Sequence, residues 1–191
     1  TSEGTYTVTL TATNSCGNDV ETKTNYITVS TPSATYATLP YSTGFESGAF
    51  DQYWFTQSSN SEGRILITTA NGPHSGSYHM TMDDNYNGGL YAQNEAWLRL
   101  NLSGKSDVAL SFWWKEFGDE DHTQDGVFLS DDGGSSFVKV YNLTGGSTTY
   151  REIDLDIDQL ASANGLSLTS TFVVKFQQYD NYSISTDGMA F

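Results

Sequence analysis

Side chains that could do chemistry are concentrated in residues 111–126, which read SFWWKEFGDEDHTQDG. The segment holds two tryptophans, one lysine, one histidine and five carboxylates. Aromatic rings beside polar groups suit the binding of sugars, and carboxylates suit either a hard cation or acid–base catalysis. Which of these functions is possible depends on the strands that carry the side chains, because each strand determines the face on which a side chain lies.

The two tryptophans lie in a predicted strand whose side chains alternate between two faces. Leu110, Phe112 and Trp114 share the apolar face, which predicts that Trp114 packs in the core, whereas Trp113 and Lys115 share the other. The segments AWLRLNL and TFVVKFQQY alternate in the same way. Their predicted core residues are Leu98, Leu100, Leu102, Phe172, Val174 and Phe176.

If these three strands belong to one sheet, its outer face combines aromatic, basic and amide side chains. The members of this predicted ligand-binding face are Trp97, Arg99, Trp113, Lys115, Lys175, Gln177 and Tyr179. Aromatic rings stack on the C–H faces of sugars while polar groups bond the hydroxyls, so the face suits carbohydrate, including an anionic polysaccharide. The alternative is that these side chains pair across strands or contact a neighbouring domain.

The remaining motifs favour structure over catalysis. The acidic stretch GDEDHTQDG lacks the spacing of an EF-hand, which predicts a solvated loop. Residues 130–137, SDDGGSSF, fit an Asp-box pattern, and we expect Asp132 to bond the amides of a turn there. G-x-S-x-G, H-E-x-x-H and P-loop motifs are absent from the sequence, so no enzyme activity is predicted, although a glycosidase pair of carboxylates would be spatial and leave no motif.

Composition excludes several classes of partner. The 191 residues carry a formal net charge of −15, which would repel the phosphates of nucleic acids and anionic membrane surfaces. No apolar run approaches the length of about 18 residues that a membrane span needs. Cys16 is the sole cysteine, so no intrachain disulfide can form. The acidic excess is typical of an extracellular protein and can attract divalent cations.

The pattern of residues is that of an all-β protein. Short apolar or alternating runs are separated by turn residues at short intervals, which predicts a two-sheet sandwich or jelly roll. The predicted strands of the main region are Arg64–Thr69, Ser77–Met82, Ala96–Leu102, Asp107–Lys115, Gly126–Ser130, Phe137–Tyr141, Arg151–Asp156 and Thr171–Gln178. A helical turn is predicted at Ile157–Ala163.

The first 30 residues form a separate unit. TYTVTLTA alternates strictly, with Tyr6, Val8 and Leu10 on one face, and GTYTVTLTATNSCGNDVETKTNYITV resembles the last third of a PKD domain, an immunoglobulin-like β-sandwich. The resemblance implies a spacer or adhesion module. Two or three strands are too few for an independent core. We therefore predict the C-terminal part of a PKD-like domain at 1–30 and a linker at 31–40, where Pro32 and Pro40 interrupt any periodicity.

Residues 41–191 resemble a second family. GFESGAF, HSGSYHMTMDD, ALSFWWKEFG and FVVKFQQYDNYSISTDGMAF occur in an order similar to MAM-type jelly-roll domains and the anchor-associated domains of Bacteroidota surface proteins. The resemblance implies a concanavalin-like or MAM-like jelly-roll sandwich. It also implies that the last strand is truncated, because the family continues past the position of Phe191 with two aspartates.

The same resemblance implies a structural calcium ion. The family's ligands correspond here to Glu46 in GFESG and to Asp83, with Asp84 beside it, in HMTMDD. Carboxylate oxygens suit Ca²⁺, which takes six to eight ligands. The later family ligand lies in the aspartate pair that this chain lacks, and the alternative is that these carboxylates cap turns.

Together these features predict a non-catalytic adhesion or binding module of a larger secreted or cell-surface bacterial protein. Its expected partners are a polysaccharide or a cell-surface protein, together with neighbouring domains of the same polypeptide. Two alternatives are a structural spacer or assembly unit of a filament or stalk, and an accessory domain of a secreted hydrolase.

Overall fold

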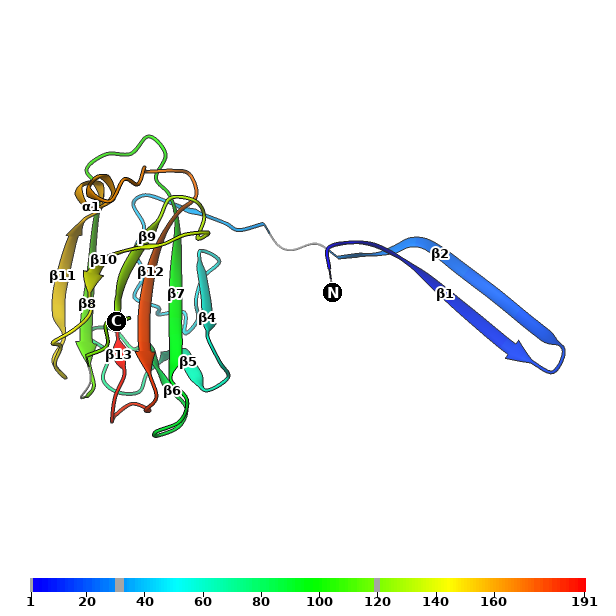
Figure 1. Cartoon of the computed structure of the whole chain (residues 1–191), viewed down its shortest axis with the longest axis horizontal. Coiled ribbons are helices and arrows are strands. Elements are labelled where there is room, and N and C mark those ends of the chain that lie inside the picture. Colours follow the sequence, from blue (N-terminus) through cyan, green and yellow to red (C-terminus); the bar gives the residue numbers. More distant parts are fainter. Residues whose placement is uncertain (1, 30–32, 119–120) are drawn as a thin grey trace. The chain divides into compact units, whose positions relative to one another are not determined.

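A computed structural model describes residues 2–29, 33–118 and 121–191 (Figure 1). Contacts divide the chain into two units, Thr1–Ala34 and Thr35–Phe191, and each is described by itself. None of the helices in the described ranges is long and apolar enough to cross a membrane. Strands make up nearly all the regular structure, so the predicted all-β class is confirmed.

The first unit is a hairpin of two antiparallel strands, β1 (Gly4–Asn14) and β2 (Gly17–Val29). Its alternation places Tyr6, Val8 and Leu10 on one face, but nothing in the unit covers that face. Leu10 is 68% exposed and Tyr26 is 63% exposed. An isolated two-stranded hairpin is at best marginally stable in water, so the main contribution to stability comes from the second unit.

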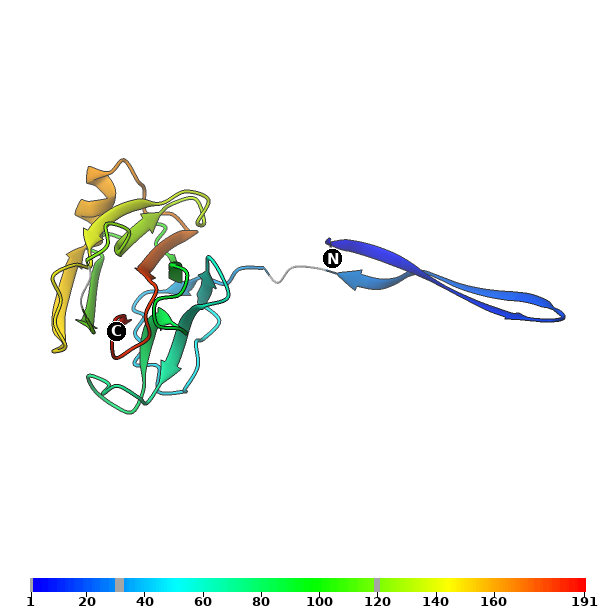
Figure 2. The same ribbon diagram turned by 60° about the horizontal axis from the view of Figure 1, so that its bottom comes forward.

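The second unit contains two sheets that face each other (Figures 1 and 2). The six-stranded sheet has the order β10-β9-β12-β7-β3, and β4 also pairs with β7. Its strands are β3 (Ala37–Thr38), β4 (Trp54–Ser58), β7 (Ala92–Asn101), β9 (Gly126–Ser130), β10 (Val138–Asn142) and β12 (Phe172–Asp180).

The five-stranded sheet has the order β11-β8-β13-β6-β5. Its strands are β5 (Gly63–Thr68), β6 (His79–Asp84), β8 (Ala109–Glu116), β11 (Arg151–Asp156) and β13 (Met189–Ala190). The central position of β13 is notable because this strand has only two residues. Its neighbours, β6 and β8, are therefore held side by side over only part of their length.

The core lies between the two sheets and follows the alternation of the sequence. The predicted core residues of β7 and β12, among them Leu98, Leu100 and Phe172, are buried, and so is Trp114 of β8. Leu110 and Phe112 are partly buried and pack against the same core. The apolar alternation therefore predicted correctly which side of each strand faces inward.

The one helix of the described ranges, α1 (Ile157–Ala163), is the predicted helical turn, and Figure 2 shows it in orange at one end of the unit. The Asp156 side chain caps it by accepting a hydrogen bond of 2.9 Å from the Gln159 amide. Ile157 and Ala161 face the core. The bounds of β9 and β11 also match the prediction. The strands β3, β4 and β13 were not predicted. β3 and β13 have only two residues each, which is too short for a pattern in the sequence.

Replacing Phe172 with alanine tests the position of the core. Phe172 is 0% exposed, so Phe172→Ala should lower the free energy of unfolding by about 3–5 kcal/mol. Leu66→Ala is the control, since Leu66 is 45% exposed and should change stability by about 0.5 kcal/mol or less. Urea unfolding measures both variants, and equal losses would contradict this description of the core.

Candidate functional site

The predicted ligand-binding face is divided between the two sheets. Trp97 and Arg99 lie on β7, and Lys175, Gln177 and Tyr179 lie on β12, all within the six-stranded sheet. Trp113 and Lys115 lie on β8 in the five-stranded sheet. The assumption that the three strands share one sheet is therefore wrong, and the seven residues cannot form one surface.

On the six-stranded sheet, Trp97 is enclosed by other side chains. Its ring lies 5.1 Å from that of Phe55 and 4.8 Å from that of Phe137, and its indole N–H donates to Glu95 at 3.0 Å. Gly134 packs directly on the indole, because a Cβ at that glycine would lie 2.5 Å from a Trp97 ring carbon. The turn after β9 thus packs against Trp97, whose ring is only partly exposed.

Lys175 and Gln177 do not point out into solvent but are buried, and each residue is 5% exposed. The Lys175 ammonium donates to Glu95 Oε1 at 2.8 Å and to Gln177 Oε1 at 2.7 Å. Gln177 in turn donates to the Gln124 carbonyl at 2.7 Å. Burial raises the pKa of Glu95, but the hydrogen bonds from Lys175 and Gln57 outweigh that effect and hold the pKa below its ordinary value.

Arg99 and Tyr179 complete this face by contacts with neighbouring rings. The Arg99 guanidinium lies 5.2 Å from the centre of the Phe55 ring, and Tyr179 stacks on Tyr91 at 4.9 Å. The outer face of the six-stranded sheet is therefore a set of mutually paired side chains. Of the two readings of this face, cross-strand pairing fits these contacts better than an open ligand platform.

The Asp-box turn has the structural role that the sequence predicts. Asp132 accepts hydrogen bonds from the Ser130 hydroxyl at 2.7 Å and from the amide and hydroxyl of Ser136 at 3.0 and 2.7 Å. These bonds, with that from Ser130 the largest cause, lower the pKa of Asp132 to about 2. Gly133 and Gly134 have φ values of 76° and 94°, which the turn requires and other residues rarely adopt.

The five-stranded sheet exposes an aromatic surface that we call the Trp113 platform, formed by Trp113, His74 and Tyr150. Trp113 is 37% exposed, and its ring stacks on that of His74 at 3.7 Å with an angle of 12° between the planes. Tyr150 meets His74 edge-on at 5.4 Å. The sequence pointed to Trp113 but not to His74 or Tyr150, because both come from loops whose position no local pattern reveals.

Lys115 lies beside the platform but is not available to a ligand. It is 6% exposed and donates to the carbonyls of Asn71 and Gly72, the latter at 2.8 Å. These bonds hold the 70–76 loop across the outer face of the sheet, where His79 bonds the Ala70 carbonyl at 2.6 Å. Burial lowers the pKa values of both Lys115 and His79. The basic residues predicted on this face therefore serve the fold.

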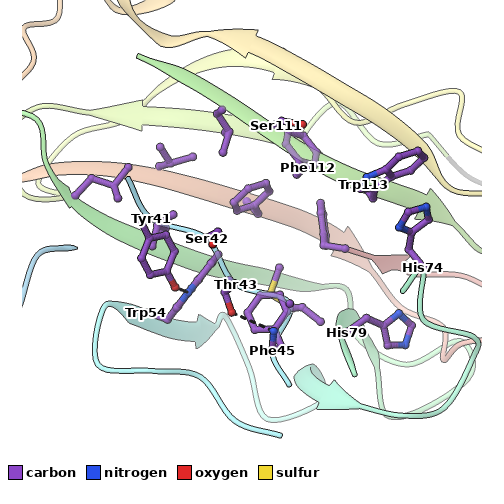
Figure 3. Close-up of a pocket in the computed structure, with 18 of the residues that line it drawn as sticks. Tyr41, Ser42, Thr43, Phe45, Trp54, His74, His79, Ser111, Phe112 and Trp113 are labelled. Atoms are coloured by element: carbon purple, nitrogen blue, oxygen red, sulfur yellow. Dashed lines mark hydrogen bonds between the residues drawn. The ribbon is translucent and has the colours of Figure 1, made fainter. Parts of the chain in front are cut away.

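A cavity of about 260 Å³ opens beside the platform and extends between the sheets (Figure 3). Its inner walls are apolar and come from both sheets, with Leu98, Val174 and Phe176 on one side and Leu110 and Phe112 on the other. The lining also includes polar groups and two rings of the platform, those of Trp113 and His74. These further lining residues are Ser42, Thr43, His74, Ser75, Ser111 and Trp113.

The three carboxylates of the predicted calcium site do not lie together. Glu46 accepts hydrogen bonds from the amides of Ser77 and Tyr78 at 3.0 and 3.1 Å, just before β6. Asp83 and Asp84 end β6, six residues further on, which is roughly 20 Å of extended chain. One ion cannot take all three as ligands.

Each of these carboxylates has a partner within the fold. Asp83 is 2% exposed and forms a bidentate ion pair with Arg64, whose Nε lies 2.9 Å from Oδ1. Asp84 accepts from the Tyr86 amide at 2.7 Å, and burial raises its pKa. No group of three or more potential metal ligands occurs in the described ranges. Calcium binding stays a prediction, but it needs a different ligand set.

The acidic loop was predicted to be solvated, but its residue Asp125 is buried. Asp119 and Glu120 of the same loop lie outside the described residues. Asp125 is 1% exposed and accepts from the amides of Tyr179 at 2.6 Å and His122 at 3.2 Å, which ties the loop to the end of β12. Burial outweighs these hydrogen bonds and raises the pKa of Asp125 to about 7.

We compared the chain with protein families, curated proteins and solved structures, and none of these comparisons assigns a function to the site. No family model and no curated protein matches the chain, so the resemblances to PKD and MAM-type domains stay predictions. A solved structure from work on the promiscuous specificity of carbohydrate-binding modules of the β-sandwich superfamily matches with 16% identity and a TM-score of 0.44. The match covers 99% of this chain and 72% of that one. A likeness at this level does not establish a shared function.

The raised pKa of Asp125 predicts how stability changes with pH. The folded state keeps this proton up to about pH 7, whereas an unfolded aspartate loses it near pH 4, so folding takes up a proton between these values. The free energy of unfolding should therefore rise by about 1–3 kcal/mol as pH falls from 7.5 to 5.

Urea unfolding across this pH range measures the effect. Asp125→Asn, which does not titrate, should flatten the dependence, while Asp154→Asn at an exposed position should not. An unchanged slope in Asp125→Asn would show that another group takes up the proton.

Removing Arg64 tests the buried ion pair with Asp83. Arg64→Met leaves the Asp83 carboxylate buried without its cation, which should lower the free energy of unfolding by about 2–3 kcal/mol. Adding Asp83→Asn to that variant should restore part of the loss. A double-mutant cycle in urea measures both effects, and additive losses would exclude the coupling.

Proposed function

We propose that residues 35–191 form a non-catalytic binding module that takes carbohydrate on the Trp113 platform. The observation that carries this proposal is the exposed Trp113 ring, which His74 holds in a fixed orientation from one side. A large aromatic surface that remains in contact with water after folding is costly unless a ligand covers it. Preorganised rings also lose little conformational entropy on binding.

The surroundings of the platform favour a neutral, hydroxyl-rich sugar. Glu152 lies directly opposite Trp113 across the β8–β11 pair, and Asp154 lies opposite Ser111. All four side chains are exposed, and the Ser111 hydroxyl donates to Glu152 at 3.1 Å. Carboxylates and hydroxyls accept hydrogen bonds from sugar hydroxyls while the sugar ring stacks on the indole. An anionic polysaccharide is disfavoured, since Lys115 and Lys175 are both buried.

The location of the perturbed carboxyl groups supports binding over catalysis. Glycosidases use two carboxyl groups beside the sugar, and the acid has a raised pKa. Here the pKa is raised to about 7 in Asp125 and to about 6 in Asp180, and both side chains are buried within the fold. Neither belongs to the platform. A module of this kind fits a secreted or cell-surface protein, where its partners would be a polysaccharide and neighbouring domains.

Binding of soluble glucans, xylans and mannans tests the proposal. Trp113→Ala should weaken binding about 5- to 30-fold, because one sugar–indole stack contributes on the order of 1–2 kcal/mol. Trp97→Phe is the matched control and should bind normally, since Trp97 is enclosed. Isothermal titration calorimetry with calcium and with EDTA would also test the calcium prediction. Failure of the folded protein to bind any of these polymers would support the spacer alternative instead.

A further inference from the structure

The buried side chain of His79 connects the two segments that carry His74 and Tyr150. His79 lies on β6 and is 2% exposed, and its Nε2 is 2.6 Å from the carbonyl oxygen of Ala70. That carbonyl begins the loop that carries His74. The Nδ1 atom of the same ring is 2.5 Å from the Tyr150 hydroxyl. One imidazole therefore bonds both segments whose rings form the platform with Trp113.

The two hydrogen bonds of His79 define the protonation state of its ring. A carbonyl oxygen can only accept a hydrogen bond, so Nε2 must carry the proton that it donates to Ala70. In a neutral imidazole the other nitrogen is an acceptor, so the Tyr150 hydroxyl donates to Nδ1. This arrangement is that of a neutral His79 with its proton on Nε2.

Tyr150 extends this chain of contacts to His74 and Trp113. Burial raises the pKa of Tyr150 to about 12, and a backbone hydrogen bond from His74 to the Tyr150 hydroxyl acts in the opposite direction. The Tyr150 ring also meets the His74 imidazole edge-on at 5.4 Å. That imidazole stacks on Trp113 at 3.7 Å (Figure 3). The orientation of the exposed indole therefore depends on contacts that lead back to His79.

The groups that face His79 disfavour a positive charge on its ring. The Lys115 ammonium, from β8, holds the same loop and lies 4.6 Å from the centre of the Tyr150 ring. Tyr150 and His74 face the ring from the two loops, and β5 places Thr68, which does not titrate, opposite His79. Burial lowers the pKa of His79, and the charge of Lys115 acts in the same direction. His79 is therefore neutral at pH 7.

We propose that neutral His79 is a positioning residue for the Trp113 platform, and that its protonation in acid disorders the platform and releases the ligand. In the imidazolium both nitrogens donate, so Tyr150 can no longer donate to Nδ1 and its hydroxyl has to rotate. The new cation also lies beside the Lys115 ammonium. For its ligand this inference rests on the proposed function, but the order of the platform can be measured without a sugar.

The pH profile of binding to soluble glucan, xylan and mannan tests the proposal. Affinity of the 191-residue chain should fall about 2- to 12-fold between pH 7.5 and pH 4.5, the equivalent of ordering one side chain on binding. His79→Gln supplies one donor and one acceptor but does not titrate, so its affinity should change little between these pH values. It should also bind more tightly at pH 7.5 than His79→Leu, which supplies neither. An equal fall in the wild type and His79→Gln would overturn the proposal.

Further variants separate His79 from its neighbours. His74→Phe keeps a ring beside Trp113 but cannot titrate, so the fall in affinity at pH 4.5 should remain. Its disappearance in His74→Phe, with an undiminished fall in His79→Gln, would assign the pH dependence to His74 and overturn the proposal. Tyr150→Phe removes only the hydroxyl and should weaken binding at pH 7.5 about 2- to 12-fold. Tyr86→Phe is the matched control at a tyrosine that is 58% exposed, and it should bind normally.

Nuclear magnetic resonance gives a readout that needs no sugar. Nuclear Overhauser cross-peaks between the His74 imidazole and the Trp113 indole, whose ring centres are 3.7 Å apart, should be present at pH 7.5 and lost at pH 4.5. They should persist at pH 4.5 in His79→Gln, in which His74 is unchanged. This result without binding of any polymer would contradict carbohydrate binding and still support the role of His79. Cross-peaks that persist in the wild type at pH 4.5 would overturn it.

Discussion

The buried ion pair between Lys175 and Glu95 determines how the outer face of the six-stranded sheet is used. The ammonium is 2.8 Å from the carboxylate and lies over the rings of Phe128 and Phe137 at 4.4 and 4.3 Å. A charge in such an apolar place requires a partner, because its desolvation would otherwise cost several kcal/mol. Gln57 and Trp97 complete the shell by donating to Glu95. The rings of this face, Trp97, Phe55 and Phe137, are in contact with one another, whereas the exposed tryptophan lies on the other sheet.

A second constraint acts on that other sheet, where β13 is the shortest strand and the central one. Its two residues pair with β6 on one side and with β8 on the other, and so set the register of these strands. The cavity beside it is lined by Trp113 and His74 as well as by apolar side chains from between the sheets. Rings and exposed carboxylates on the outer face of this sheet suit a sugar and its hydroxyls.

The sequence predicted much of the local structure and little of the site. The bounds of β9, β11 and α1 follow from runs that turn residues or a capping aspartate delimit, and Trp114 and Phe172 follow from alternation. The seven-residue face failed because alternation assigns a side chain to one side of its own strand and says nothing about which strands are neighbours. The sequence also failed to predict burial on the outer face. Lys175 points away from the core and was therefore expected in solvent, but side chains from other segments cover it.

By itself, the sequence determined the all-β class, the inward set of each strand and the bonding of the Asp-box turn, since these depend on residues close together in the chain. Only the tertiary structure decided that Glu46 and Asp83 cap and pair at separate places and that Trp113 stacks on His74. These outcomes depend on contacts between residues 19 to 39 positions apart. Such contacts are fixed by the packing of whole sheets, because the free energy of burying a core outweighs the preference of any single side chain.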